Sequence, residues 1–282
     1  MDKEEIYVAN FHSNEWIMDR VGEHDNEAKT IIPSSFIFGT FYQGSGNYGL
    51  DCINSDVDTK VITIPSLDTI CFNKKPLSTT HIRENNEHID LKDIRLYFQC
   101  FRKQNINFLE ILFTDYALIN PLFATEYLEL VAHNEEIAHY DILSAAATIK
   151  GMALEKYHAL KHPYPSKTEV LATFGYDPKQ LHHLVRFTTF ATDYLSGKSY
   201  QDCLHAADAE HLIAIKQGWY SLEKAEQLAE QSLLFIVNLI DSFREKYADM
   251  PINQEVDDLL NDVQSKIIKK SIKRELQEED NI

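Results

Sequence analysis

The front part of the chain alternates short apolar runs with polar turns. Residues 31–43 are rich in Ile, Phe and Thr and end at Gly44, which predicts a strand followed by a tight turn. Residues 57–65 alternate apolar and polar positions up to a proline, which predicts a second strand. Residues 87–91 are a short third candidate. This part of the chain is therefore expected to contain a small sheet.

Helical spacing of apolar residues takes over further along the chain. It predicts a helix over 92–103, whereas the apolar run 106–113 does not decide between helix and strand. From about residue 121 the spacing is almost entirely helical, with one interruption at Pro163 and Pro165. The predicted helices are 121–132, 141–161, 178–196, 207–217, 221–247 and 253–275.

These elements predict an α+β fold in two parts. We expect a sheet-containing domain over residues 1–135 and a helical domain over residues 136–282. Ligand sites often lie where two domains meet, so a site in the cleft between the two parts is expected.

Composition narrows the class of protein. The chain has 282 residues, of which 44% are hydrophobic and 25% charged, as in ordinary globular proteins. Its formal net charge is −17, which repels phosphate backbones and anionic membranes. We therefore expect neither membrane binding nor broad non-specific nucleic-acid binding. Acidic sites that hold Mg²⁺ remain compatible with this charge.

The cysteines and the N-terminus indicate a reducing compartment. No pair of cysteines has C-x-x-C spacing, so we expect reduced thiols and a cytoplasmic protein. The polar, acidic N-terminus lacks the features of a signal peptide, and no apolar run is long enough to span a bilayer. The cysteines are Cys52, Cys71, Cys100 and Cys203.

One segment combines features of phosphate and metal chemistry. Gly44 and Ser45 follow a predicted strand and open a predicted helix, where backbone amides can approach a phosphate. After ten further residues, Asp56 and Asp58 flank Val57 at the start of the next strand. Because alternate residues of a strand share a face, both carboxylates are expected to project together, with Val57 turned into the core.

Paired carboxylates repel each other unless a cation lies between them, and Mg²⁺ prefers such oxygen ligands. Phosphoryl displacement with two ions generally needs a third carboxylate from a neighbouring strand. Asp90 is the natural candidate, because Ile89 and Leu91 on either side are apolar. Asp93 is the runner-up, in the helical pattern that follows. The predicted metal ligands and catalytic residues are thus Asp56, Asp58 and Asp90, with Mg²⁺ or Mn²⁺ as the ion.

Residues 36–60 resemble the signature of the DNA polymerase beta-like nucleotidyltransferase superfamily, in which an apolar strand and Gly-Gly or Gly-Ser precede Asp-x-Asp. The closer resemblance is to the predicted nucleotidyltransferases that accompany RNA ligases in bacteria and phages. Segments similar to KQNINFLEILF (103–113) and GYDPKQLHHLVRF (175–187) extend the resemblance, which runs from about residue 36 to 245. The matched residues of the first motif are Ser45, Tyr48, Gly49, Ser55, Asp56 and Asp58.

The resemblance implies a small mixed sheet with helices on one side, followed by a helical domain that closes the nucleotide cleft. It implies transfer of a nucleoside monophosphate from a nucleoside triphosphate, such as ATP, to a hydroxyl, with pyrophosphate leaving. The association with RNA ligases suggests RNA end repair, by analogy only.

Further residues are expected to hold the nucleotide. Gly44 and Ser45 are the predicted phosphate binders. Lys60 follows Asp58 by two positions and should point to the same side, where it can steady a phosphate or balance the carboxylates. Tyr48 can stack on a base, or it can pack beside the turn.

A second group of candidates lies in the helical part. Lys179, His183 and Arg186 fall at positions i, i+4 and i+7 and share one face of a helix. This face can bind the triphosphate, or it can be a solvated surface. His182 lies about 100° further round the helix and is expected to pack or to face solvent.

The acceptor and the activity leave alternatives open. The acceptor hydroxyl can belong to RNA or to a protein, as in toxin-like or regulatory nucleotidylation, and the acidic charge mildly favours a small or protein acceptor. A non-catalytic nucleotide-binding protein of the same fold is the remaining candidate. A calcium loop around Asn54 to Asp58 fits poorly, because the glycine and the closing glutamate of such loops are missing.

Overall fold

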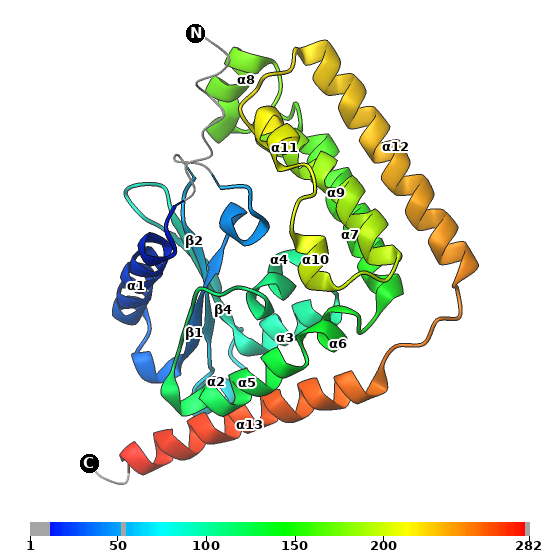
Figure 1. Cartoon of the computed structure of the whole chain (residues 1–282). Helices are drawn as coiled ribbons and strands as arrows, with labels where there is room; N and C mark the ends of the chain where they lie inside the picture. The colour runs from blue at the N-terminus through cyan, green and yellow to red at the C-terminus, as the bar shows by residue number, and fades with distance from the viewer. Residues whose placement is uncertain (1–11, 52–54, 280–282) are drawn as a thin grey trace. The chain divides into compact units, whose positions relative to one another are not determined.

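The computed structural model describes residues 12–51 and 55–279 (Figure 1). The chain folds into two compact units. The helical unit comprises Tyr48–Leu50 and Asp141–Ile252. The sheet unit comprises the described parts of Ala9–Asn47, Asp51–Tyr140 and Asn253–Ile282. The last helix thus groups with the sheet, whereas the sequence pattern had suggested a single division at residue 135.

Five strands of the described chain form one mixed sheet in the order β3-β4-β2-β1-β5. β2 and β4 run parallel, and the other neighbouring strands run antiparallel. This order places β2, which follows the Asp-x-Asp motif, in the centre of the sheet. The strands are β1 (Ile37–Gln43), β2 (Asp58–Thr63), β3 (Ser78–Ile82), β4 (His88–Asp93) and β5 (Ala117–Ile119).

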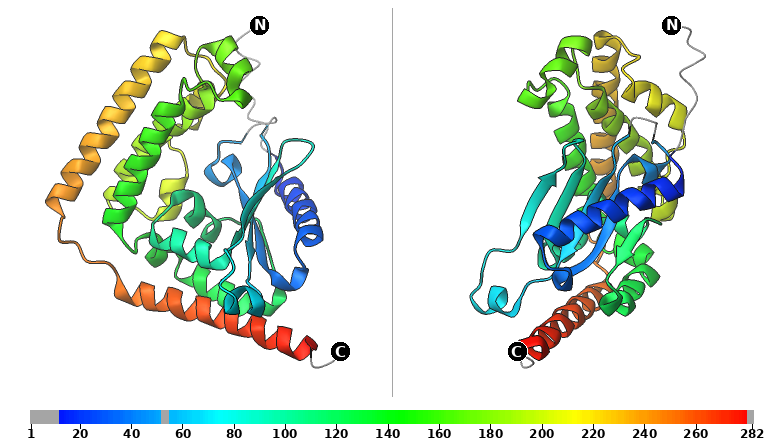
Figure 2. Two further views of the ribbon diagram at one scale, coloured as in Figure 1. Left: turned by 180° about the vertical axis from the view of Figure 1, so that it is seen from behind. Right: turned by 90° about the vertical axis from the view of Figure 1, so that its left-hand side faces the viewer.

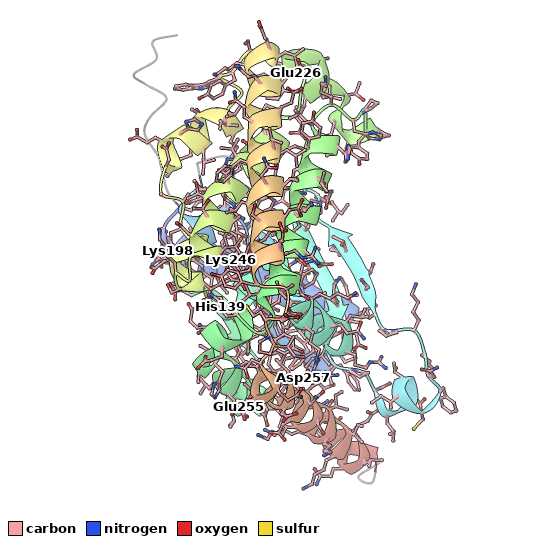
Figure 3. All side chains as sticks on the ribbon, turned by 90° about the vertical axis from the view of Figure 1, so that its right-hand side faces the viewer. His139, Lys198, Glu226, Lys246, Glu255 and Asp257 are labelled. Atoms are coloured by element: carbon pink, nitrogen blue, oxygen red, sulfur yellow. The ribbon has the colours of Figure 1, made fainter. Side chains whose placement is uncertain are left out.

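Helices surround the sheet and include the last one of the chain. That helix, α13, runs along α3 and α5 (Figure 1). Its buried positions recur every three or four residues, at Val256, Leu260, Val263 and Ile267. Near its start (Figure 3), Asp257 accepts a hydrogen bond of 2.7 Å from Arg102 Nε. The α-helices of this unit are α1 (Asn14–Ile31), α2 (Leu67–Cys71), α3 (Ile94–Arg102), α4 (Ile106–Leu109), α5 (Ala124–Ala132), α6 (Asn134–Ala138) and α13 (Gln254–Glu279).

Both faces of the sheet are covered. On one face α1 lies across the strands (Figure 2), and its Ala28 packs with Val61 and Leu91. Because side chains alternate along a strand, Lys60 points to the opposite face, where its Nζ lies 4.4 Å from the Phe108 ring of α4. The resemblance had implied helices on one side. The second layer arises because α3 and α4 follow β4 directly and bury their own apolar side chains on the sheet.

The helical unit is built around α9. Helices α7, α10, α11 and α12 all contact it, and its buried side chains include Leu181, Leu184 and Phe187. Ser221 caps α12, because its hydroxyl accepts a hydrogen bond from the Lys224 amide. The helices are α7 (Ile142–Ala159), α8 (Thr168–Phe174), α9 (Pro178–Leu195), α10 (Tyr200–Leu204), α11 (Ala209–Lys216) and α12 (Leu222–Lys246).

The α+β class is confirmed, and the predicted strands and helices correspond to β1, β2, β4 and to α3, α5, α7, α9, α11, α12 and α13. The ambiguous run 106–113 becomes α4 and the 3-10 turn Glu110–Leu112. The sequence pattern missed α1, β3 and β5, and it also missed the short helices α2, α6, α8 and α10. Short 3-10 turns complete the described elements at Ser34–Phe36, Ser45–Tyr48, Pro121–Phe123 and Pro165–Lys167.

Candidate functional site

The segment from Asp56 to Asp58 leads into β2 with its middle residue buried. Val57 is 1% exposed and packs with Ile17 and Val21 of α1. Asp56 is exposed and Asp58 partly buried, so burial alternates along the segment as the sequence predicted. Burial raises the pKa of Asp58, and the charge of Asp56 raises it further. The two carboxylates therefore repel each other.

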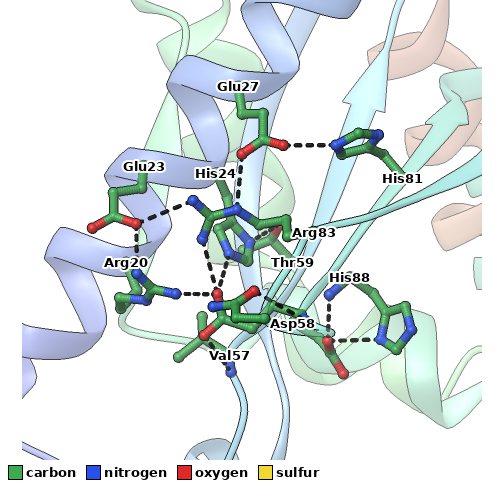
Figure 4. A network of polar contacts seen from close by, with 12 residues as sticks. Arg20, Glu23, His24, Glu27, Val57, Asp58, Thr59, His81, Arg83 and His88 are labelled. Carbon is green, nitrogen blue, oxygen red and sulfur yellow. Dashed lines mark hydrogen bonds and ion pairs between the residues drawn. The ribbon is translucent and has the colours of Figure 1, made fainter.

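Asp58 is oriented by the neighbouring parallel strand. Its Oδ1 accepts a hydrogen bond of 2.8 Å from the backbone amide of His88, and His88 Nδ1 lies 3.1 Å from the same oxygen (Figure 4). These contacts oppose the effect of burial on the Asp58 pKa. Both contacts involve Oδ1, so His88 does not contact the second carboxylate oxygen, Oδ2.

Asp90, the predicted third carboxylate, is paired elsewhere. It lies beside Lys60 in the parallel register of β2 and β4, with Oδ2 at 3.7 Å from Lys60 Nζ. Its Oδ1 accepts a hydrogen bond of 3.3 Å from Thr80. Among the residues that the structure describes, no three His, Cys, Asp or Glu side chains are grouped so as to hold one metal ion. Asp90 as a third metal ligand thus stays a prediction.

Asp93, the alternative third carboxylate, has a structural role. It is 2% exposed, caps α3 by accepting the Arg95 amide at 2.8 Å and pairs with the Arg95 side chain. Its oxygens are committed to the helix start, which rules it out as a metal ligand in this arrangement.

Lys60 points to the same side as Asp90 but is buried. Only 4% of the residue is exposed, and Phe108 and Asp90 enclose its ammonium group. Burial lowers the pKa of Lys60 to about 8, although Asp90 opposes that shift. Of the two roles considered for Lys60, the contacts favour charge balance, here toward Asp90.

The Gly44-Ser45 turn has the backbone that only glycine adopts readily. Gly44 has φ of 148°, and a single 3-10 turn, Ser45–Tyr48, follows it. The expected α-helix after Ser45 is absent from this described segment, so the expected helix N-terminus for phosphate is wrong. The cause is local: the Gly46 amide donates to the Tyr42 hydroxyl at 3.0 Å, and Asn47 donates to Gly44.

Ser45 nevertheless joins the turn to the carboxylate segment. Its hydroxyl donates to the Ser55 hydroxyl at 3.3 Å, and Ser55 directly precedes Asp56. The side chain of Ser45 thus lies beside the residues predicted to hold the metal, in keeping with its predicted contact with phosphate.

A buried polar network behind β2 was missed from the sequence. Glu87 is 5% exposed, and its Oε2 pairs with Arg20, Arg83 and His24 (Figure 4). Its Oε1 accepts the backbone amide of Val57 at 3.4 Å. Burial alone would raise the pKa of Glu87, but hydrogen bonds from its partners lower it to about 2. The network holds the Asp-x-Asp backbone from behind.

The network also reaches β2 itself. His24 Nδ1 lies 3.0 Å from Thr59 Oγ1, and burial lowers the pKa of His24 below its ordinary value. The available sequence signal was weak: His24 follows Ile17 and Val21 at helical spacing, and Glu87 follows a polar turn. Neither residue by itself indicates a buried partner.

In the helical unit, the three residues of the predicted cationic face differ in environment. Lys179 is exposed. Burial lowers the pKa of His183 well below its ordinary value, so this imidazole adds no positive charge at neutral pH. Arg186 is 5% exposed and lies 3.8 Å from the centre of the Tyr48 ring, which is itself buried. Nucleotide binding by these four residues stays a prediction.

The expectations about cysteines and membranes can be compared with the described part of the chain. Cys71, Cys100 and Cys203 form no disulfide. Cys52 lies outside the described residues. Among the helices described, each is too short or too polar to cross a bilayer.

Comparisons with known proteins give little further information. No family model matches the chain, and no curated protein matches it. Among solved structures, it is similar to a nucleotidyltransferase-like protein from Exiguobacterium sibiricum. That similarity has a TM-score of 0.30 and 13% identity, over 80% of this chain and 75% of the other. A TM-score this low does not establish a common fold, so the case for a function comes from the site residues.

Proposed function

We propose that the chain is a metal-dependent nucleotidyltransferase that moves a nucleoside monophosphate from a nucleoside triphosphate to a hydroxyl and releases pyrophosphate. The observation that carries the proposal is the carboxylate pair Asp56 and Asp58 around the buried Val57. The pair lies at the start of a central strand, and Ser45 of the preceding Gly-Ser turn contacts the same segment.

The donor set of this pair suits a hard divalent ion. Burial raises the pKa of Asp58 most, and repulsion by Asp56 raises it further. A cation between the two carboxylates removes that repulsion. Mg²⁺ is commonly bound by one or two carboxylates with substrate phosphates and water, and Mn²⁺ accepts the same ligands. Asp56 and Asp58 would hold the ion, and Asp90 would have to leave Lys60 to join them.

Each residue of the site has a role in this proposal. Asp58 binds through the oxygen that faces away from His88, while His88 fixes the orientation of the carboxylate. Ser45 hydrogen-bonds to a phosphate oxygen from the neighbouring turn. When bound, the metal ion supplies positive charge to the phosphate oxygens during displacement. The network around Glu87 keeps the backbone of the pair in place.

One observation favours a second candidate, a non-catalytic nucleotide-binding protein. The ion pair between Lys60 and Asp90 separates the expected third carboxylate from the first two. If that pair persists with nucleotide bound, the site has two carboxylates where the resemblance implies three. Such a site can bind a metal and nucleotide without carrying out transfer.

The test of the proposal is nucleotidyl transfer with labelled nucleoside triphosphates and Mg²⁺, with RNA and a cell lysate as acceptors. The wild-type chain is expected to label one acceptor class and to release pyrophosphate. The variants Asp56→Asn and Asp58→Asn are expected to lose transfer and stay folded, because each substitution relieves repulsion. Asp19→Asn, which removes one exposed carboxylate from α1, is the matched control.

The outcomes separate the candidates. Transfer that survives in both aspartate variants contradicts the proposal. Nucleotide binding by the wild type without transfer to any acceptor supports the non-catalytic candidate. Asp90→Asn decides the third ligand: loss of transfer equal to that of Asp56→Asn assigns it to the metal, and retained transfer leaves it with Lys60.

A further inference from the structure

A cavity with a volume of about 310 Å³ lies beside Asp56 in the sheet unit. Its lining includes His12, which precedes α1, and Trp16 and Arg20 of α1. Ser55 and Asp56 and two residues before β4, Asn85 and Glu87, complete it. Pockets for small molecules range from about 300 to 1,000 Å³, so this cavity has room for a group of nucleotide size. Asp56 also belongs to the site described above, whereas the aromatic residues of the cavity do not.

Two stacked rings form the apolar wall of the cavity. The ring centres of His12 and Trp16 are 3.7 Å apart, and their planes differ by 18°. Both residues are anchored: the His12 amide donates to Asp51, and the Trp16 amide donates to Ser13, the cap of α1. Trp16 is 37% exposed. The stack therefore presents a flat, fixed aromatic surface that is partly open to solvent.

The charges around the cavity favour a neutral ligand. Arg20 is held by Glu23 and Glu87, and Arg83 also pairs with Glu87, so both cations are neutralised. Asp56 is a further carboxylate in the lining of the cavity. A phosphate placed here would meet carboxylates without a free counter-charge, whereas a flat neutral group would stack without that repulsion.

The polar wall suits the edge of a base. Asn85 lies in the turn before β4, and its side-chain oxygen accepts the Glu87 amide at 3.3 Å. An amide side chain offers both a donor and an acceptor to a planar heterocycle. Asp56 belongs both to this wall and to the proposed metal site. A base bound here would therefore lie beside the reacting phosphate.

We propose that this cavity binds a nucleobase, stacked on Trp16 with its polar edge toward Asn85. This inference rests on the proposed function, because it names the ligand of a cavity that adjoins the proposed metal site. The base can belong to the nucleoside triphosphate or to the terminal nucleotide of a single-stranded acceptor. Stacking on aromatic side chains binds bases of any sequence, which suits either source.

The test uses the fluorescence of Trp16. The chain has two tryptophans, so Trp219→Phe leaves Trp16 as the single reporter. ATP and a single-stranded oligoribonucleotide with a free 3′-hydroxyl are titrated separately, and quenching of Trp16 is expected with at least one of them. Quenching by ATP assigns the donor base, and quenching by the oligonucleotide assigns the acceptor base.

Affinity measurements by calorimetry complete the test. Trp16→Ala is expected to weaken binding of the quenching ligand by about 5- to 150-fold, the range of base stacking on aromatic side chains. Trp16→Phe should retain most of the affinity, which guards against a folding defect. Inorganic triphosphate, which lacks a base, should bind wild type and Trp16→Ala equally. Trp219→Phe is the matched control.

Several results would overturn the inference. These are no quenching by either nucleotide ligand, equal affinities of wild type and Trp16→Ala, or quenching only by an aromatic peptide, which would indicate a protein ligand. The two proposals fail separately. If Asp56→Asn loses transfer but Trp16→Ala binds the nucleotide ligands as tightly as wild type, the base pocket alone is refuted. If base binding depends on Trp16 but the wild type transfers no nucleotide, the proposed transferase activity alone is refuted.

Discussion

Asp58 and His88 lie side by side on parallel strands, one residue before the registered pair Thr59 and Ile89. His88 contacts Asp58 Oδ1 through both its backbone amide and its ring. Two positions further along, Lys60 and Asp90 form the next pair on the same face. The parallel pairing of β2 and β4 thus orients one predicted metal ligand and neutralises another.

The first prediction concerns His88. His88→Ala keeps the backbone hydrogen bond to Asp58 but removes the ring that fixes the carboxylate. Groups that orient metal ligands typically contribute about 10- to 100-fold in metal affinity, so the Mg²⁺ concentration needed for nucleotide binding should rise within that range. Titration calorimetry at several Mg²⁺ concentrations measures the effect.

His81→Ala is the control for this variant. The side chains of His81 and His88 are both 42% exposed, and each histidine lies beside a carboxylate, Glu27 for His81. Among the contacts that the structure describes, the His81 side chain pairs with Glu27 and not with Asp56 or Asp58. Equal Mg²⁺ requirements of His88→Ala and wild type would show that the ring does not position Asp58.

The second prediction concerns Lys60. Its pKa is lowered to about 8 by burial, below the ordinary value of 10.5, so the unfolded state holds this proton more tightly. Stability from this group is therefore complete above pH 10.5 and is lost as the pH falls through about 8. The wild-type free energy of unfolding should rise by about 2 kcal/mol from about pH 7.5 to about pH 9.5 relative to Lys60→Met.

Urea denaturation of both proteins at the two pH values provides the measurement. Lys92→Met is the control, because Lys92 lies over the same Phe108 ring at 4.7 Å but is less buried. A parallel pH dependence of wild type and Lys60→Met would place the ammonium group in solvent. Unchanged triphosphate affinity in Lys60→Met would remove Lys60 from the predicted phosphate binders.

The third prediction concerns Glu87. Its pKa of about 2 lies below the ordinary 4.5, so its contribution is present above pH 4.5 and is lost as the pH falls toward 2. Glu87→Gln removes the charge and leaves Arg20 and Arg83 facing each other. The free energy of unfolding at neutral pH should fall by about 3 kcal/mol, as measured by denaturant titration.

Glu23→Gln is the matched control for Glu87. Glu23 binds the same two arginines, but its side chain is 49% exposed, and exposed ion pairs contribute about 0 to 1 kcal/mol. The difference between the two variants should also shrink between pH 4.5 and pH 2. A loss of equal size in both variants would mean that burial of Glu87 does not decide its contribution.

The fourth prediction concerns His182 in the helical unit. Burial lowers its pKa to about 4, although its Nδ1 contacts the Leu212 carbonyl. The contribution of neutral His182 to the free energy of unfolding is therefore complete above pH 6.5, and it is lost as the pH falls through about 4. From about pH 7 to about pH 5, wild type should lose about 2 kcal/mol more than His182→Asn, whose amide can still donate to that carbonyl.

Thermal or urea unfolding at these two pH values measures the loss. His183, whose pKa is also lowered, remains in the variant and retains part of the pH dependence. His162→Asn is the control, because His162 is exposed in the same unit. Identical pH dependence of wild type and His182→Asn would contradict a neutral, buried His182.

The sequence by itself determined the local elements and the candidate residues. Apolar spacing located β1, β2, β4 and the helices α7, α9, α12 and α13, because a buried face requires a period of two in a strand and about 3.6 in a helix. The same rule placed Val57 in the core between two carboxylates and Asp90 on the face opposite to Ile89 and Leu91. These properties depend only on neighbours along the chain.

Only the tertiary structure decided which helices or side chains each face of an element contacts. The apolar stripe of α13 fits any groove of suitable shape, and only the fold assigns it to α3 and α5. Likewise, only the parallel register places Lys60 beside Asp90, the residue predicted to be the third metal ligand. Glu87 stands first in the predicted strand 87–91, and only the fold surrounds it with Arg20 and His24. Pairing across strands and helices depends on residues far apart in sequence, and periodicity contains no information about them.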